Sequence, residues 1–189
     1  SLLTALGNLV IFEATNAATN IEPWVSDGTL AGTIQLANIS ATGSSDPTSM
    51  RAVPELGYVF FDANAGGTIG RELYRTDGTA AGTVLVSDIR SGSNSSSPTN
   101  LSRALGLLFF SADSGGNGIE PYVSNGTGAG TVQLANISAG GGDSNPYGFT
   151  EAGGIVYFGA DGPDGVELYR TDGTPRDTSL VENIRIRTN

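Results

Sequence analysis

The stretch Glu72–Thr79, which reads Glu-Leu-Tyr-Arg-Thr-Asp-Gly-Thr, decides the fold because the chain repeats it four times. The related copies span Glu22–Thr29, Glu120–Thr127 and Glu167–Thr174. The glutamates that open the four copies lie 50, 48 and 47 residues apart in a chain of 189 residues. A period of about 40–50 residues that holds several short strands is typical of a β-propeller, in which each repeat forms one blade. The repeats therefore predict an all-β, four-bladed propeller domain over residues 1–189, with blades at about 1–46, 47–97, 98–144 and 145–189.

The four repeats alternate between two types. The first and third begin Glu-Pro-aromatic-Val-Ser and continue into identical segments, Gln35–Ala41 and Gln133–Ala139. The second and fourth instead share Glu-Leu-Tyr-Arg-Thr-Asp-Gly-Thr, so the blade order is A-B-A-B. We expect a ring closed within one chain, whereas half of an eight-bladed ring made by two chains is the alternative, which would be a homo-oligomer.

Each repeat contains four short apolar runs without helical periodicity, which predicts four strands per blade. The second run is the most hydrophobic, and its β-branched and aromatic residues indicate a strand buried on both faces. The third run is the repeated motif itself, and its Asp-Gly or Asn-Gly end predicts a tight turn. The first, second and fourth runs are expected at 2–6, 9–12 and 33–39 in repeat 1, and at 49–53, 58–61 and 83–89 in repeat 2. In repeat 3 they are expected at 100–105, 107–110 and 131–137, and in repeat 4 at 147–152, 155–158 and 179–184.

The composition excludes several classes of function. The chain has no cysteine and no histidine, so thiolate catalysis, disulfides and the usual general base are absent. All nine basic residues are arginine, which removes lysine-dependent Schiff-base and phosphate-loop chemistry. A net charge of −10 disfavours nucleic acid as a partner, and the lack of a long apolar run argues against membrane insertion.

The repeat resembles the bacterial ELWxxDGT-repeat proteins, whose units run Gly-x-Glu-Leu-Trp-x-x-Asp-Gly-Thr-x-x-Gly-Thr after a Phe-Phe-x-Ala strand. Phe60–Ala63 and Glu72–Thr83 match this pattern closely, and all four repeats share it. Tyr replaces Trp in three repeats and Pro replaces Leu in two. The resemblance implies a propeller-like fold and a secreted or cell-surface location, and it brings no agreed activity.

The repeated glutamate and the aromatic residue two places later form the first candidate site. Strand alternation puts the two side chains on one face, where an aromatic ring stacks on a sugar and a carboxylate accepts its hydroxyl groups. The alternative is that the ring is a wedge between blades and the carboxylate accepts hydrogen bonds from turn amides. The candidate ligand-binding residues are Glu22, Trp24, Glu72, Tyr74, Glu120, Tyr122, Glu167 and Tyr169.

The loops after the second strands form the second candidate site. Asp113, Asp161 and Asp164 lie in glycine-rich loops that faintly resemble oxygen-rich calcium sites, although the full ladder of ligands is missing. Ordinary polar turns account for the same residues, so the sequence leaves open whether these loops bind calcium or whether the chain has no cofactor.

Three functions follow in order of preference. Acids that recur at equivalent places suggest a secreted, non-enzymatic binding propeller with several equivalent sites, which we expect to serve lectin-like recognition of a glycan or a cell-surface partner. The alternatives are a purely structural or assembly module of a surface repeat protein and, least favoured, a carboxylate-dependent glycoside hydrolase.

Overall fold

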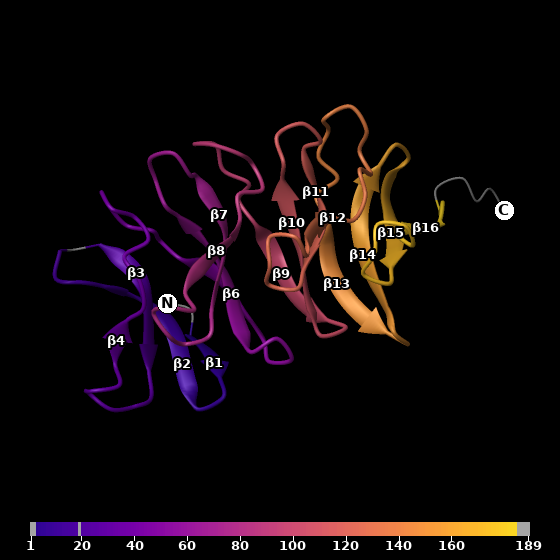
Figure 1. Ribbon diagram of the computed structural model, residues 1–189. Coiled ribbons are helices and arrows are strands. Elements are labelled where there is room, and N and C mark those ends of the chain that lie inside the picture. Colours follow the sequence, from indigo (N-terminus) through magenta and orange to yellow (C-terminus); the bar gives the residue numbers. More distant parts are fainter. Residues whose placement is uncertain (1–2, 19, 185–189) are drawn as a thin grey trace.

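The computed structural model describes residues 3–18 and 20–184, which form four sheets of four antiparallel strands each (Figure 1). Within each sheet the strands follow chain order, so every blade is a simple meander. Blade 1 consists of β1 (Leu3–Leu6), β2 (Leu9–Thr15), β3 (Ile21–Ser26) and β4 (Ile34–Gln35). Blade 2 consists of β5 (Thr48–Val53), β6 (Tyr58–Asn64), β7 (Arg71–Thr76) and β8 (Val84–Ser87). Blade 3 consists of β9 (Thr99–Ala104), β10 (Leu107–Asp113), β11 (Ile119–Ser124) and β12 (Thr131–Gln133). Blade 4 consists of β13 (Tyr147–Ala152), β14 (Ile155–Gly162), β15 (Gly165–Thr171) and β16 (Ser179–Glu182).

The predicted strands are present, but their lengths differ in two consistent ways. The second strand of each blade runs three to four residues beyond its apolar run, because the polar end of that run pairs with the start of the motif strand, as Ala63 does with Glu72. The fourth strand stops early, because the chain turns away after Gln35 and the amide of Ile39 donates to the Glu22 carboxylate instead of continuing the ladder. Leu2, expected in the first strand, lies outside the described residues.

The Asp-Gly-Thr turn that joins the third and fourth strands is held by its own side chains. In blade 2, Asp77 Oδ1 accepts hydrogen bonds from the amide and the hydroxyl of Thr79 at 2.9 and 2.6 Å. Gly78 has a φ of +89°, a backbone conformation that glycine adopts without steric cost. A Cβ at Gly82 would lie 2.0 Å from Asp77 Oδ1, so both glycines of the motif are required by this turn.

Apolar side chains fill the three junctions between neighbouring blades. At the junction of blades 2 and 3, Phe60 and Leu73 of one blade pack with Phe110 and Tyr122 of the next. The junctions of blades 1 and 2 and of blades 3 and 4 are built from the equivalent positions. Both faces of the second strand are therefore buried in β6 and β10, one against each neighbouring blade, as the sequence predicts. The same prediction is wrong for β2 and β14, which are buried on one face, because each has a neighbouring blade on one side only among the described residues.

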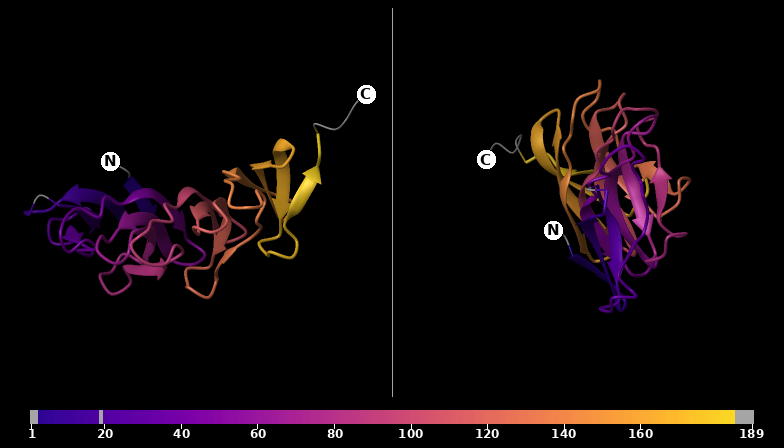
Figure 2. Two further views of the ribbon diagram at one scale, coloured as in Figure 1. Left: turned by 90° about the horizontal axis from the view of Figure 1, so that it is seen from above. Right: turned by 90° about the vertical axis from the view of Figure 1, so that its left-hand side faces the viewer.

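The blades stand in an open row, with blade 1 and blade 4 at opposite ends (Figures 1 and 2). Contacts between blades join the first strands in succession, β1 with β5, β5 with β9 and β9 with β13. The expected closure within a single chain is therefore wrong for residues 3–184. The apolar clusters likewise join each blade to the next one along the chain, and none of the three joins blade 4 to blade 1.

No helix among the described residues is long and apolar enough to span a bilayer.

Candidate functional site

The repeated glutamates lie inside the blades and not at an open surface. Glu22, Glu72 and Glu120 are fully buried, and Glu167 is nearly so. In each blade the carboxylate accepts a hydrogen bond from the isoleucine amide 17 residues later, at 3.0 or 3.1 Å. These contacts support the structural alternative for the glutamates, and sugar binding at them stays a prediction without a supporting contact.

A serine in the linker to the next blade supplies the second partner of three glutamates. The hydroxyl of Ser45 donates to Glu22 at 2.7 Å, Ser96 donates to Glu72, and Ser144 donates to Glu120 at 2.6 Å. Burial raises the pKa of the Glu72 carboxyl, and the hydrogen bonds from Ser96 oppose that rise. Each of these three glutamates therefore connects its blade to the linker that follows it.

These serines were not predicted as functional residues from the sequence, although a signal for them exists. All three occur as Ser-x-Pro immediately before the first strand of a blade. The carbonyl oxygen of each serine accepts a hydrogen bond from a backbone amide near the end of the next blade's second strand. The donors are the amides of Asn64 for Ser45, Asp113 for Ser96 and Asp161 for Ser144, at 2.7–2.9 Å. One linker serine thus connects two blades, through its hydroxyl on one side and its carbonyl on the other.

Three of the four candidate aromatic residues are wedges between blades. Tyr74, Tyr122 and Tyr169 are buried and stack on a phenylalanine of the adjacent strand, with ring centroids 6.0, 5.6 and 5.8 Å apart. Burial raises the pKa of each of these phenols. Trp24 occupies the same position in blade 1 and is only half-buried, because no blade precedes it in the described structure.

The loop acids are engaged within the chain. Asp113 forms an ion pair with Arg90 and accepts the amide of Gly115 at 2.6 Å. Asp164 accepts a hydrogen bond of 2.6 Å from Asn183, while the amide of Asp161 donates to the linker. The described residues contain no group of three or more histidine, cysteine or acidic side chains that would hold a metal ion. Calcium at these loops stays a prediction.

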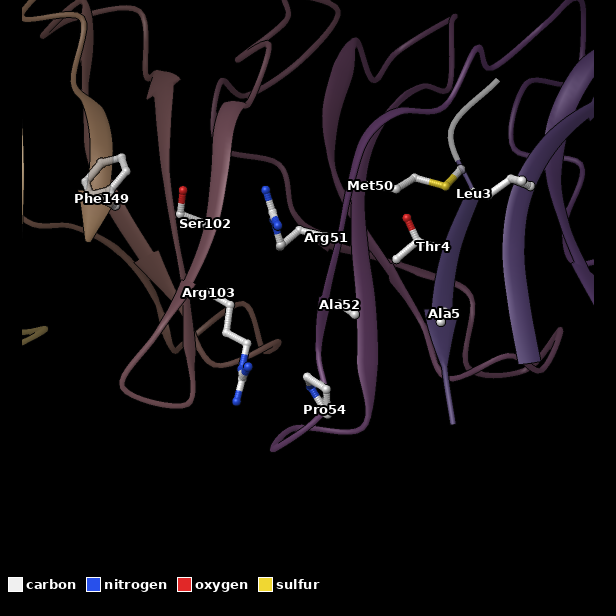
Figure 3. Close-up of a pocket in the computed structure, with 10 residues that line it drawn as sticks. All are labelled: Leu3, Thr4, Ala5, Met50, Arg51, Ala52, Pro54, Ser102, Arg103 and Phe149. Carbon is white, nitrogen blue, oxygen red and sulfur yellow. The ribbon is translucent and has the colours of Figure 1, made fainter. Parts of the chain in front are cut away.

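A hollow lies on the face formed by the first strands of the blades, the wall that lines the channel in a closed propeller (Figure 3). Its volume is about 750 Å³. The lining residues come from all four blades and are Leu3, Thr4, Ala5, Met50, Arg51, Ala52, Pro54, Ser102, Arg103 and Phe149.

Two arginines give this hollow its charge. Arg51 is exposed, and its Nε donates to the carbonyl of Leu101 at 2.9 Å, which fixes the guanidinium between β5 and β9 (Figure 3). Arg103 is paired with Glu55, whose two carboxylate oxygens accept from its Nε at 3.0 and 2.9 Å. Within residues 3–18 and 20–184, Arg51 makes no ion pair, so its charge faces the hollow beside the hydroxyls of Thr4 and Ser102.

Comparison with known proteins supports the fold alone. No family model and no curated protein matches the chain. Among solved structures, TolB from Acinetobacter baumannii is similar with a TM-score of 0.52 and 16% identity, over 91% of this chain and 40% of TolB. An α-L-arabinofuranosidase from Clostridium thermocellum is 15% identical over 95% of this chain and 71% of its own. An endo-1,4-β-xylanase from Bacteroides thetaiotaomicron is 10% identical over 96% of this chain and 71% of the xylanase.

The two glycosidases superpose with TM-scores of only 0.38, so their activities carry no argument here. The chain spans about two fifths of the length of TolB. Four antiparallel four-stranded sheets in succession, together with this likeness, show that the chain is an all-β protein of four β-propeller blades.

Proposed function

We propose that this chain is a non-enzymatic, lectin-like binding module of the secreted or cell-surface class, and that it holds a carbohydrate in the hollow on the inner face. The observation that carries the proposal is the hollow itself, which all four blades line. The repeated glutamates are occupied by the amides and hydroxyls of their own blades, so ligand contacts fall to the first strands instead.

The lining chemistry suits a sugar with an acidic substituent. Leu3 and Pro54 offer exposed apolar surface of the kind that packs against a sugar ring, while Thr4 and Ser102 offer hydroxyls. The Arg51 guanidinium presents planar donors that match a carboxylate or sulfate group. None of the ten lining residues is acidic, whereas hydrolysis of a glycosidic bond generally needs two carboxyl groups that flank the bond. This lining supports binding over hydrolysis.

The test is a glycan array that includes neutral, uronate-containing and sulfated oligosaccharides, followed by calorimetric titration of any ligand found. We expect saturable binding that favours acidic sugars. Arg51→Ala should weaken it at least tenfold, because it removes a charge-assisted contact worth about 1.5–3 kcal/mol. Arg176→Ala, an exposed arginine in the β15–β16 turn, is the matched control and should bind like the parent chain.

The absence of binding to any glycan on the array, or equal affinities of the parent and Arg51→Ala chains for the ligand, would contradict the proposal. Repeating the titration with a chelator tests calcium at the loops, since loss of binding on chelation would move the site to Asp113, Asp161 and Asp164.

A further inference from the structure

The two end blades expose faces that every inner junction buries. Position by position, Val181 in blade 4 corresponds to Leu36, Val86 and Leu134 in blades 1 to 3. Those three residues are 2%, 7% and 1% exposed because the next blade covers them, whereas Val181 is 42% exposed. Leu168 likewise corresponds to the fully buried Leu73 and is exposed. Among the described residues, no strand packs against this face of blade 4.

Blade 1 exposes the opposite face. In blades 2 to 4, the corresponding face packs against the preceding blade. Val10 corresponds to Val59, Leu108 and Val156, which are completely buried, yet it is 37% exposed. Leu3 is also exposed, while its counterparts Met50, Leu101 and Phe149 lie in the core. The chain thus carries both halves of one junction, uncovered at its two ends (Figure 1).

A hollow on blade 4 shows where the missing half belongs. It measures about 400 Å³, and Tyr157 and Leu168 line it. Their counterparts in blade 2, Phe60 and Leu73, pack on Phe110 and Tyr122 of blade 3. By the same register, Phe12 and Trp24 of a first blade would enter the hollow. Both of these side chains are only half-buried in the described structure.

The glycine of each motif turn gives a second, independent indication. Cβ atoms built at Gly78, Gly126 and Gly173 would lie 2.6, 3.1 and 3.6 Å from Leu9, Tyr58 and Leu107, each the first residue of the preceding blade's second strand. Gly28, the counterpart in blade 1, has no atom within 4 Å of that position. In blade 4, Ile155 holds the position of Leu9, Tyr58 and Leu107, so it is the residue that the turn glycine of a following blade would face.

We propose that a second copy of this chain covers both faces, so that blade 4 of each copy docks on blade 1 of the other and two chains close an eight-bladed ring. The contact is head-to-tail, and it continues the interface that the chain already makes three times internally. It also continues the A-B-A-B order, because a B-type blade meets an A-type blade. Propellers typically have about 4–8 blades, so two copies are the largest number that fits. This proposal does not rest on the carbohydrate-binding function.

The test is the solution mass of the 189-residue chain by light scattering at about 10–100 µM, for the parent and three variants. We expect the parent to have the mass of two chains. Val10→Asp and Val181→Lys each place a charge in the junction and should give monomers. Ile34→Asp is the control: this residue is 47% exposed, but its counterparts Val84 and Val132 are 36% exposed, so it lies outside the junction and should leave the dimer intact.

Mixing the two monomeric variants gives the decisive result. A Val10→Asp chain and a Val181→Lys chain can form one unaltered junction and one in which Asp meets Lys, so the mixture should regain the mass of two chains. A face-to-face dimer through either end alone would not be rescued in this way. A monomeric parent chain, a dimer insensitive to both variants, or a mixture that stays monomeric would each overturn the proposal.

Discussion

The Asp-Gly-Thr turns show how single residues explain a repeated motif. Asp27, Asp77 and Asp172 each accept two hydrogen bonds from the threonine two residues later, and these bonds hold the pKa of the three carboxyls below the ordinary value. Asn125 makes the same pair of bonds in blade 3, at 3.0 and 2.8 Å, without a charge. The turn therefore needs an acceptor oxygen at this position and does not need its ionisation.

Asp77→Asn tests this distinction. The folded pKa of Asp77 lies below its ordinary value of 3.8, so the carboxylate stabilises the fold above that pH and the contribution disappears as the pH falls through the folded pKa. We expect the variant to match the parent within about 0.5 kcal/mol at neutral pH, as surface substitutions usually do. Its free energy of unfolding should fall less steeply between neutral pH and about pH 3, measured by urea titration with circular dichroism.

Asp77→Ala is the comparison for this experiment, because it removes both bonds to Thr79 and should destabilise the chain at neutral pH as well. Equal acid sensitivity in the parent and the Asn variant would show that the turn carboxylate does not contribute to the pH dependence.

At the scale of elements, the linker serines decide how strands of one blade are joined to the next. Ser96 is buried, and its amide and hydroxyl both donate to the carboxylate of Glu72, while its carbonyl accepts the amide of Asp113. The linker is thus built into the blade junction and is not a passive connection.

Ser96→Ala should lower the free energy of unfolding by about 1–3 kcal/mol, because the buried Glu72 carboxylate loses a donor that water does not replace. Thermal and urea unfolding measure the effect. Ser93→Ala, in the exposed part of the same linker, is the control and should be neutral. Equal stabilities for the two variants would mean that the hydroxyl is dispensable and that the backbone bonds alone hold the junction.

At the scale of the whole molecule, we expect the stability of the fold to depend on the junction between blades 2 and 3. Phe110 is fully buried between blades 2 and 3 and stacks on Tyr122. Phe110→Ala should cost about 3–5 kcal/mol through lost burial and the cavity left behind, a large part of the stability of an ordinary domain. Thermal denaturation checks this, with Leu30→Ala as the control because Leu30 is almost completely exposed. A variant that melts with the parent would place Phe110 outside the cooperative core.

Much of this architecture was predictable from the sequence, because it depends on local periodicity. The apolar runs such as Tyr58–Phe61 and the Asp-Gly turns fix strands and hairpins within each repeat, and the structure contains them. The angle between blades was not predictable, since it depends on how side chains from two repeats, such as Phe60 and Phe110, interleave.

The candidate site was harder to predict for a related reason. Glu120 and Tyr122 do lie on one strand, as the alternation predicts, but both are buried. Sequence alone does not show which strand face a neighbouring blade covers. The hollow between first strands was missed because Thr4, Arg51 and Ser102 share no repeated motif, so only the three-dimensional arrangement brings them together.

The hydrogen bonds of the repeated glutamates join residues that lie close together in the sequence, which affects how the chain folds during its synthesis. Glu72 receives its partners from Ile89 and Ser96, which follow it by 17 and 24 residues, and none of these partners comes from an earlier blade. A blade can therefore complete its polar core soon after its own exit segment leaves the ribosome, before the next blade has been translated. We expect the chain to fold in the order of its synthesis, with each finished blade offering its exposed face as the template on which the following one condenses.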